Sequence, residues 1–379
     1  MKRRSFLKKA GLGLAAGTAA VAPGIVNAQG AALPTVSWRM AASWPKSLDT
    51  IYGGAELISK RVAAATGGKF TIKVFAAGEI VGALQVLDAV QSGSVECGHT
   101  APYYYFGKDP TFAFATSIPF GLNARQQFAW MHHGGGIELM RDFYKDFGIH
   151  NLPAGNTGAQ MGGWFRKEIK SVADLKGLKM RIGGTAGLVL TKLGVVPQQI
   201  GAPDIYPALE KGTIDAAEWV GPYDDEKLGF FKVAKNYYYP GWWEGGPQLD
   251  MMIGQKHWDA LPAEYKAILE SACAEAYGWM VAKYDAVNPA ALKRLISQGV
   301  RVRPFTNDVM AACYKASEEV FTEIAGKNAK FAKVYEPWKK FRDEQAQWLS
   351  IAENRFDNFM IAAQRTAQAG PAKGAPAKK

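Results

Sequence analysis

Residues 87–97 read L-D-A-V-Q-S-G-S-V-E-C, and residues 206–216 read Y-P-A-L-E-K-G-T-I-D-A. In each stretch a predicted helix ends at a glycine, Gly93 or Gly212. One linking residue then leads into a strand that opens with a β-branched, an acidic and a small residue. Glycine suits the left-handed conformation that commonly ends a helix. Two copies of one helix–glycine–strand unit therefore predict two similar α/β lobes.

Predicted strands and helices alternate around both copies. This succession is typical of a doubly wound α/β domain with a mainly parallel sheet. Ligands of such sheets bind beyond the carboxyl ends of the strands, often in a cleft between domains, so residues just after strands are candidate site residues. The predicted strands are residues 36–42, 70–75, 95–99, 178–182, 196–200 and 214–220, and the predicted helices are residues 50–65, 81–91, 186–193 and 205–210.

The first residues predict export. Residues 2–8 read K-R-R-S-F-L-K, an Ala- and Gly-rich apolar run covers residues 10–22, and small residues at 26–28 suit a signal peptidase. The run is shorter than the roughly 20 residues that span a bilayer. We therefore expect residues 1–28 to be a twin-arginine signal peptide that directs the rest of the chain to the periplasm.

Most of the formal charge of +11 lies at the ends of the 379-residue chain. Five basic residues precede residue 10 and three follow residue 370, which leaves about +3 for the body. A nucleic-acid-binding protein would keep a basic stripe within its fold, so this class is disfavoured. Cys97, Cys273 and Cys313 are too few and too far apart for a disulfide framework, and we expect buried thiols, with one disulfide as the alternative.

No catalytic constellation stands out. Residues 132–136 read H-H-G-G-G, which resembles the oxyanion-hole loop of some esterases, but no G-x-S-x-G elbow accompanies it. The sequence has no H-E-x-x-H, no Walker loop and no dinucleotide fingerprint after a strand, and its five histidines lack zinc spacing. We predict that the protein is not an enzyme.

Charged residues follow two predicted strands of the second lobe. Arg181 lies near the end of strand 178–182 and is followed by two glycines. A guanidinium can hold a carboxylate through two hydrogen bonds, and glycines let a ligand approach the backbone; a surface arginine at a strand edge is the alternative. Glu218 and Trp219 end strand 214–220, where an acid needs a partner because a buried unpaired carboxylate is costly.

Two glycine-rich segments add further polar groups. Glu244 lies in G-W-W-E-G-G-P at 241–247, between aromatic residues and a flexible turn. Asn156 and Gln160 lie in G-N-T-G-A-Q-M-G-G-W at 155–164, where they offer amide donors and oxygens. Each position alone is a weak signal, but their shared placement after predicted strands predicts a site for a small carboxylate.

With these residues the chain resembles the solute-binding proteins of tripartite ATP-independent periplasmic (TRAP) transporters, the DctP-like family. The resemblance is to the branch that binds 2-oxo acids and related monocarboxylates, and it covers nearly the whole chain after residue 28. Its most specific piece is D-L-K-G-L-K-M-R at 174–181. It is also carried by F-A-A-G-E-I at 75–80, L-D-A-V-Q-S-G at 87–93, L-E-K-G-T-I-D-A-A-E-W at 209–219 and Y-P-G-W-W-E at 239–244.

The resemblance implies a two-lobed periplasmic binding protein fold with a hinge and a long C-terminal helix. It implies capture of a pyruvate- or lactate-like acid with a bridging cation, and delivery to TRAP membrane permease subunits. A periplasmic enzyme acting on a 2-oxo acid and a ligand-sensing module are the alternatives. The implied ligand contacts are Arg181, Gln160, Asn156, Tyr104, Trp219 and Glu244, and the implied cation ligands are Gln160, Glu218, the Trp219 backbone oxygen and Glu244.

Charge balance supports the cation. A monocarboxylate neutralises Arg181, which leaves Glu218 and Glu244 to repel each other unless one takes up a proton. A hard cation with oxygen ligands removes this repulsion, and a 2-oxo acid chelates it through its own oxygens. The charge count favours a divalent ion and the resemblance favours sodium, so we expect sodium, with calcium as the alternative.

We expect the chain to divide into a signal peptide at 1–28, a first lobe at 29–153, a second lobe at 154–254, a helical segment at 255–369 and a disordered Ala/Pro/Lys tail at 370–379. The helical segment is expected to return to the lobes and to end in the long helix. An apolar stripe along this helix packs either on the chain's own body or on a second subunit, which leaves a homodimer open. The stripe consists of Trp338, Phe341, Trp348, Ile351, Phe356 and Met360.

Overall fold

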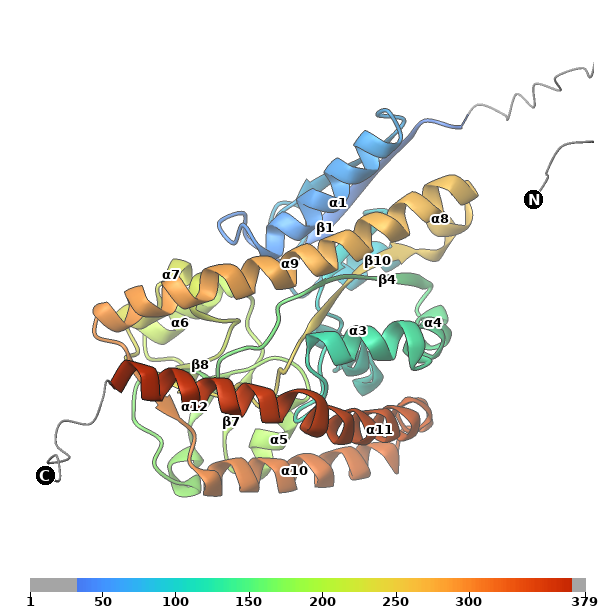
Figure 1. The fold of residues 1–379 in the computed structure, drawn as a ribbon. Helices are drawn as coiled ribbons and strands as arrows, with labels where there is room; N and C mark the ends of the chain where they lie inside the picture. Colours follow the sequence, from blue (N-terminus) through green and yellow to red (C-terminus); the bar gives the residue numbers. More distant parts are fainter. Residues whose placement is uncertain (1–32, 370–379) are drawn as a thin grey trace, which may run out of the picture. The chain divides into compact units, whose positions relative to one another are not determined.

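Two β-sheets organise residues 33–369, the part of the chain that the computed structural model describes (Figure 1). The predicted signal peptide, 1–28, and the predicted tail, 370–379, lie outside the described residues. From Thr35 onward the described residues form one structural unit. Within it each sheet and its helices form one lobe of a two-lobed α/β fold, as predicted.

The first sheet has the strand order β2-β1-β3-β10-β4. β1 pairs in parallel with β2 and β3, and parallel neighbours need a crossover, which α1 and α2 supply. β10 joins much later in the sequence and pairs antiparallel with both β3 and β4. The bounds are β1 (Val36–Ala42), α1 (Ile51–Ala65), β2 (Phe70–Phe75), α2 (Val86–Gln91), β3 (Cys97–Thr100), β4 (Ile149–Asn156) and β10 (Gln248–Gly254).

The second sheet has the strand order β11-β9-β5-β8-β6-β7. β6 pairs in parallel with β7 and β8, while β5 runs antiparallel between β8 and β9. β8 is shorter than the predicted strand 214–220, because the chain leaves the sheet just before Glu218. The bounds are β5 (Gly163–Phe165), β6 (Lys179–Arg181), α5 (Ala186–Lys192), β7 (Val196–Gln198), α6 (Ala202–Glu210), β8 (Ala216–Ala217), α7 (Pro222–Leu228), β9 (Asn236–Tyr239) and β11 (Arg301–Pro304).

The two copied sequence units occupy matching places in the two lobes. Gly93 follows α2 and leads toward β3, and Gly212 follows α6 and leads toward β8. Both adopt the predicted left-handed conformation, with φ of 73° and 72°. Each sheet is mainly parallel, as predicted, with one antiparallel strand, β10 in the first sheet and β5 in the second. β10 also falls within residues 154–254, the predicted second lobe, yet it pairs in the first sheet.

The 35-residue helix α9 (Ala263–Ser297) connects the two lobes (Figure 1). It contacts α1 and β4 of the first lobe and α7 of the second. In the first lobe the Met280 side chain fills space left by Gly54 and Gly155, where an added Cβ would lie 2.5 and 2.7 Å from its methyl group. α9 is therefore the element that both lobes share.

The C-terminal helices carry the predicted apolar stripe, which divides in two. Trp338 is buried and its ring lies 5.7 Å from Phe114, whereas Trp348, Ile351 and Phe356 are 61%, 76% and 64% exposed. The remaining bounds are α3 (Ala124–His133), α4 (Gly136–Lys145), α8 (Gln255–Asp259), α10 (Asn307–Ala325), α11 (Ala329–Leu349), a π-helical turn (Ser350–Asn354), α12 (Arg355–Ala369) and the 3-10 turns Pro102–Tyr105, Pro110–Ala115, Val172–Leu175 and Phe230–Lys232.

The cysteines behave as small buried residues. Cys97, Cys273 and Cys313 are all buried and none forms a disulfide, as predicted. Within residues 33–369 no helix combines the length and apolar character needed to cross a membrane.

Candidate ligand-binding site

A small cavity of about 10 Å³ lies at the carboxyl ends of strands from both sheets. Trp44 follows β1, Tyr104 follows β3 and Trp219 follows β8, so both lobes supply its walls. This is where open α/β sheets bind ligands. The lining residues are Trp44, Ile51, Ala101, Tyr103, Tyr104, Thr116, Thr157, Gln160, Trp219, Val220, Pro247 and Leu249.

Arg181 ends β6 and is only 1% exposed. Its Nη1 donates to the Glu218 carboxylate and to the Glu218 backbone oxygen at 2.8 Å, and its Nε donates to the Ile200 backbone oxygen at 3.0 Å. Burial works against the charge, but Glu218 raises the pKa of Arg181 above its ordinary value. Among the described residues Nη2 has no hydrogen-bond partner. The guanidinium is thus anchored on one side and has one nitrogen available for an anion.

Glu218 follows β8 and is fully buried. Its Oε1 accepts hydrogen bonds from Arg181 and, at 2.8 Å, from the Gly183 backbone N–H, while Oε2 has no partner in the described part of the chain. Burial raises its pKa, and the Arg181 charge opposes this shift. We expected this buried acid to need a partner, and Arg181 of the same chain is that partner.

Glu244 is the least compensated acid of the site. It is 1% exposed, and neither carboxylate oxygen has a hydrogen-bond partner among residues 33–369. Burial, followed by the charge of Glu218, raises its pKa well above its ordinary value, and the nearby Tyr103 hydroxyl and Arg181 charge oppose this shift only in part. Two buried acids therefore share one guanidinium, an arrangement that favours either a bound proton or an added cation.

Gln160 and Trp219 connect these charges to the cavity. The Gln160 Nε2 donates to Thr157 Oγ1 at 2.9 Å, which turns its Oε1 away from that bond and leaves it without a partner in the described chain. Its backbone N–H donates to the Glu244 carbonyl at 3.3 Å. The Trp219 ring lies 5.1 Å from the Arg181 guanidinium and 6.2 Å from the Trp44 ring, so it bridges the charged residues and the opposite wall.

Tyr104 and Asn156, both predicted to line the pocket, have different surroundings. Tyr104 lines the cavity and stacks on Tyr103 with ring centres 5.1 Å apart. Asn156 is not among the lining residues. Its Nδ2 donates to the Gly246 carbonyl and to a tyrosine hydroxyl at 2.8 Å each, and its Oδ1 accepts from the Gly158 N–H at 2.8 Å. Its amide therefore orders the glycine-rich segment that carries Gln160.

The Tyr103 side chain fills the space beside Gly183 and Gly184, which we expected the ligand to occupy. A Cβ on Gly183 would lie 2.7 Å from the Tyr103 hydroxyl oxygen, and one on Gly184 would lie 2.3 Å from its ring. The glycines after Arg181 thus admit a side chain of the other lobe. Nothing in the local sequence pairs these segments, although the resemblance implied a ligand contact at the neighbouring residue, Tyr104.

The buried His99 holds the Trp44 side chain, which forms one wall of the cavity. This histidine was not identified from the sequence as part of the site. Trp44 Nε1 donates to His99 Nδ1 at 2.8 Å, and His99 Nε2 lies 3.2 Å from the Ala154 carbonyl. Burial lowers the pKa of His99 to about 4, so the ring is neutral and Nε2 carries the proton. The H-H-G-G-G segment, in contrast, ends α3 and begins α4, and it adds no residue to the cavity lining.

The buried groups without partners describe what the site can bind. Buried polar groups in folded proteins nearly always have partners, so a cluster without them indicates a ligand. Arg181 Nη2 suits a carboxylate, while the free oxygens of Gln160, Glu218 and Glu244 suit a hard cation. Within the described chain no group of three or more His, Cys, Asp or Glu residues could hold a metal. A cation here therefore also needs amide, backbone or ligand oxygens.

Comparison with known proteins identifies the family. Residues 40–328 match the family model described as bacterial extracellular solute-binding protein, family 7 (DctP). The chain belongs to this family. A monocarboxylate 2-oxoacid-binding periplasmic protein from Nostoc sp. is 53% identical to it over 366 residues, which cover 96% of this chain and 100% of the relative. The family predicted from the motifs is confirmed, and the protein is a solute-binding protein.

Solved structures of other family members share the fold. A TRAP solute-binding protein from Bordetella bronchiseptica with calcium and picolinate is 56% identical, with a TM-score of 0.87 over 88% of this chain and 99% of that one. One from Pseudoalteromonas atlantica with sodium and pyruvate is 41% identical, with a TM-score of 0.83 over 86% and 99%. One from Colwellia psychrerythraea with calcium and pyruvate is 38% identical, with the same TM-score and coverage.

Proposed function

We propose that this family 7 protein captures a 2-oxo acid or a related small monocarboxylate, the size of pyruvate or lactate, together with a bridging cation. Arg181 holds the ligand carboxylate, and Gln160, Tyr104, Trp219 and Glu244 surround the ligand. The carrying observation is that Arg181 Nη2 is a buried donor without a partner in the described chain, beside two buried acids. The named ligands of the Nostoc, Pseudoalteromonas and Colwellia relatives support the same ligand class.

The cation in this proposal is sodium, with calcium as the alternative. Its ligands are the Gln160 amide oxygen, Glu218, the Trp219 backbone oxygen and Glu244. The unpartnered oxygens of Gln160, Glu218 and Glu244 are of the kind that hard cations prefer. The cation also reduces the repulsion that raises the pKa of Glu244. Asn156, which the resemblance implied as a ligand contact, acts in this proposal through the segment that it orders.

The proposed setting is the periplasm, which the chain reaches through its twin-arginine signal. There it delivers the captured acid to TRAP membrane permease subunits and does not transform it. The lobe boundaries at 153 and 254 and the helical segment 255–369 remain predictions. Family membership supports the extracytoplasmic location, and K-R-R-S-F-L-K at 2–8 supports the export route.

We also propose that the chain forms a homodimer through its last helices. Trp348, Ile351, Phe356, Phe359 and Ile361 are between 49% and 76% exposed, which is unusual for large apolar side chains that follow one another along a helix. We expect a dimer in light scattering after gel filtration. The exchange of Phe359 for Asp should shift it to a monomer with an unchanged far-ultraviolet spectrum, and a wild-type monomer would contradict the proposal.

Calorimetric titration tests the ligand directly. Purified protein, freed of bound ligand by unfolding and refolding, is titrated with pyruvate in sodium, in calcium and in chelator with choline as the only cation. We expect binding that requires one of the two cations. Binding that is equal in all three buffers would remove the cation, and turnover of pyruvate would make the protein an enzyme.

A further inference from the structure

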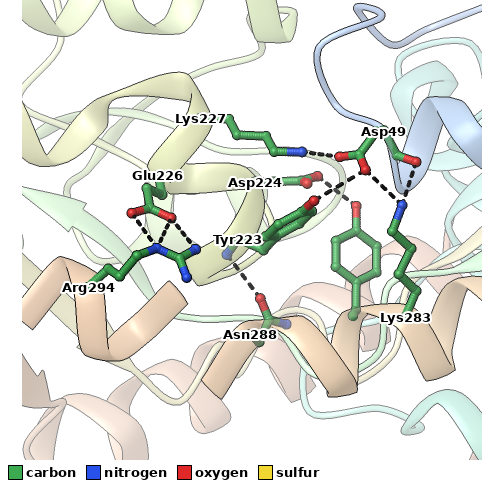
Figure 2. Close-up of polar contacts among 9 residues, drawn as sticks. Asp49, Tyr223, Asp224, Glu226, Lys227, Lys283, Asn288 and Arg294 are labelled. Carbon is green, nitrogen blue, oxygen red and sulfur yellow. Dashed lines mark hydrogen bonds and ion pairs between the residues drawn. The ribbon is translucent and has the colours of Figure 1, made fainter. Parts of the chain in front are cut away.

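A second charged cluster lies between the two lobes, outside the cavity (Figure 2). Asp49, just before α1 of the first lobe, accepts a hydrogen bond from Lys227 of α7 and one at 3.2 Å from the hydroxyl of Tyr223. Lys283 of α9 donates to the same carboxylate at 2.8 Å and to the Asp49 backbone oxygen at 2.9 Å. Asp49 is half-exposed, while the two lysine side chains are 28% and 24% exposed.

α7 is fastened to the second half of α9, so these two segments act as one body. The Asn288 side-chain oxygen accepts from the Tyr223 backbone N–H at 3.0 Å, a donor that a helix start otherwise leaves free. Arg294 binds Glu226 through a forked ion pair with a shortest contact of 2.6 Å (Figure 2). A buried Tyr284 hydroxyl also donates to Asp224 at 2.6 Å.

The part of α9 that ends at Lys283, just past the middle of the helix, is fastened to the first lobe instead. Met280 packs against Gly54 of α1 and Gly155 of β4. Lys283 follows one turn later and holds both the backbone and the side chain of Asp49. The contact of Asp49 with Lys283 therefore joins groups on one side of the molecule. Its contacts with Lys227 and Tyr223 cross from one lobe to the other.

Both partners of the crossing contact connect through short segments to the cavity. Asp49 lies two residues before Ile51, and Tyr223 lies three residues after Val220, and both Ile51 and Val220 line the cavity. A separation of the lobes at this contact therefore moves two walls of the cavity apart.

We propose that Asp49, Lys227 and Tyr223 form an interlobe latch that slows ligand release by holding the lobes closed. This inference rests on the proposed function, because release is measured with pyruvate. Burial acts to raise the pKa of Asp49, but hydrogen bonds from Lys227 and Lys283 lower it to about 2, so the carboxylate stays charged at neutral pH. In a variant without Lys227, Lys283 still forms an ion pair with Asp49, so the Asp49 carboxylate is not left unpaired.

Pyruvate dissociation measured by stopped-flow fluorescence, in the cation that supports binding, tests the latch. We expect Lys227→Gln to release pyruvate about threefold faster with an unchanged association rate, the size of effect expected for a half-exposed ion pair. Tyr223→Phe should give a smaller increase. The matched control is Arg294→Gln. It removes the ion pair that joins α9 to Glu226, the residue before Lys227 on α7, and this pair does not cross between the lobes. Pyruvate should dissociate from this variant at the wild-type rate.

Two further measurements distinguish an interlobe latch from a purely local effect of the substitution on α7. Higher ionic strength from choline chloride, at constant site cation, should speed release from the wild type and not from Lys227→Gln, because salt screens the pair. Spin labels on exposed residues of the two lobes, at Lys60→Cys and Lys211→Cys, report the distance between them without pyruvate. Lys227→Gln should broaden this distance toward an open form, and Arg294→Gln should not.

The outcomes distinguish the two proposals. Equal dissociation rates and equal distance distributions in Lys227→Gln and the wild type would overturn the latch, and so would an equal gain in rate for Arg294→Gln. A wild type that binds no pyruvate with either cation overturns the proposed function instead, and the distance distributions alone then decide the latch.

Discussion

The charged cluster in the cavity and the charged cluster between the lobes have opposite balances. In the cavity, buried Glu218 and Glu244 share the single cation Arg181, and several of their atoms have no partner in the described chain. Between the lobes, the half-exposed Asp49 faces two lysines and has partners for both carboxylate oxygens. A buried cluster with more acids than cations favours a bound proton or an added cation, whereas a half-exposed acid that faces two lysines is already neutralised.

The pKa shifts of the two clusters follow the same contrast. Burial, reinforced by Glu218, raises the pKa of Glu244, while the two lysines outweigh burial at Asp49 and lower its pKa to about 2. The two pKa values shift in opposite directions for different reasons. In the cavity, desolvation disfavours the charged form of Glu244. Between the lobes, solvent and two lysines favour the charged form of Asp49. Substitutions in and around the two clusters should therefore differ widely in effect, with the largest at Arg181 and the smallest at Arg294.

Arg181→Ala should weaken pyruvate binding at least about 30-fold. The ligand carboxylate and Glu218 would then lack their buried partner, which costs at least about 2 kcal/mol. Calorimetric titration measures the loss, and Arg181→Lys, which keeps the charge without the planar fork, should retain part of the affinity. Unchanged affinity in Arg181→Ala would exclude this residue from the site.

The contribution of the buried acids Asp225 and Asp250 to stability without ligand should fall as pH rises from about 4 to about 7. Burial raises the pKa of Asp225 to about 7 against hydrogen bonds from Tyr237 and Trp164, and burial likewise raises the pKa of Asp250 to about 7. The folded chain then binds more protons than the unfolded chain, so this contribution is complete below about pH 4 and is lost through about pH 7.

Urea unfolding of the ligand-free protein at pH 5 and pH 8 measures this effect. We expect a difference on the order of 2 kcal/mol for each acid between the two pH values. Asp250→Asn should reduce the slope, while Asp49→Asn should leave it unchanged because Asp49 stays ionised throughout this range. An equal slope in Asp250→Asn and the wild type would contradict the assignment of a raised pKa to this buried acid.

Glu244→Gln should weaken cation binding about tenfold and raise the melting temperature of the ligand-free protein. The amide removes one negative charge from the cation ligands, and it also removes a buried carboxylate that has no hydrogen-bond partner in the described chain. Titration with sodium and calcium and differential scanning calorimetry give the two values. Glu226→Gln, which changes a surface acid, is the control, and equal cation affinity in both variants would place the cation elsewhere.

Arg294→Gln should have the smallest effect, a change in melting temperature below about 1 °C. In its ion pair with Glu226 the Arg294 side chain is 51% exposed and Glu226 is 20% exposed, and partly exposed pairs contribute little to stability. Differential scanning calorimetry in low and high salt provides the measurement. A loss of several degrees would show that α7 depends on this pair far more than its exposure indicates.

The repeated units, the strand ends and the charged residues after them were visible in the sequence because they depend on local properties. Gly93 and Gly212 end helices as predicted, and Arg181, Glu218 and Glu244 are buried together as expected of polar residues placed after strands. Periodicity and glycine placement act within a few residues, so one chain carries these signals without reference to the rest of the fold.

Other features came from contacts between segments that are distant in the sequence. β10 comes from far along the sequence and inserts antiparallel between β3 and β4 in a sheet that is otherwise parallel, as predicted. Tyr103 fills the space beside Gly183, and the Asn156 amide is used within the protein. No local pattern encodes these pairings, because each depends on which surfaces the folded lobes bring together.

The sequence by itself determined the family, the two α/β lobes and the residues that carry charge at the strand ends. The tertiary structure alone decided which of these charges have partners: Glu218 meets Arg181, Glu244 meets none in the described chain, and Asp49 meets Lys227 across the lobes. The physical reason is that residue type and spacing are local properties, whereas burial and charge pairing depend on every segment packed around a group.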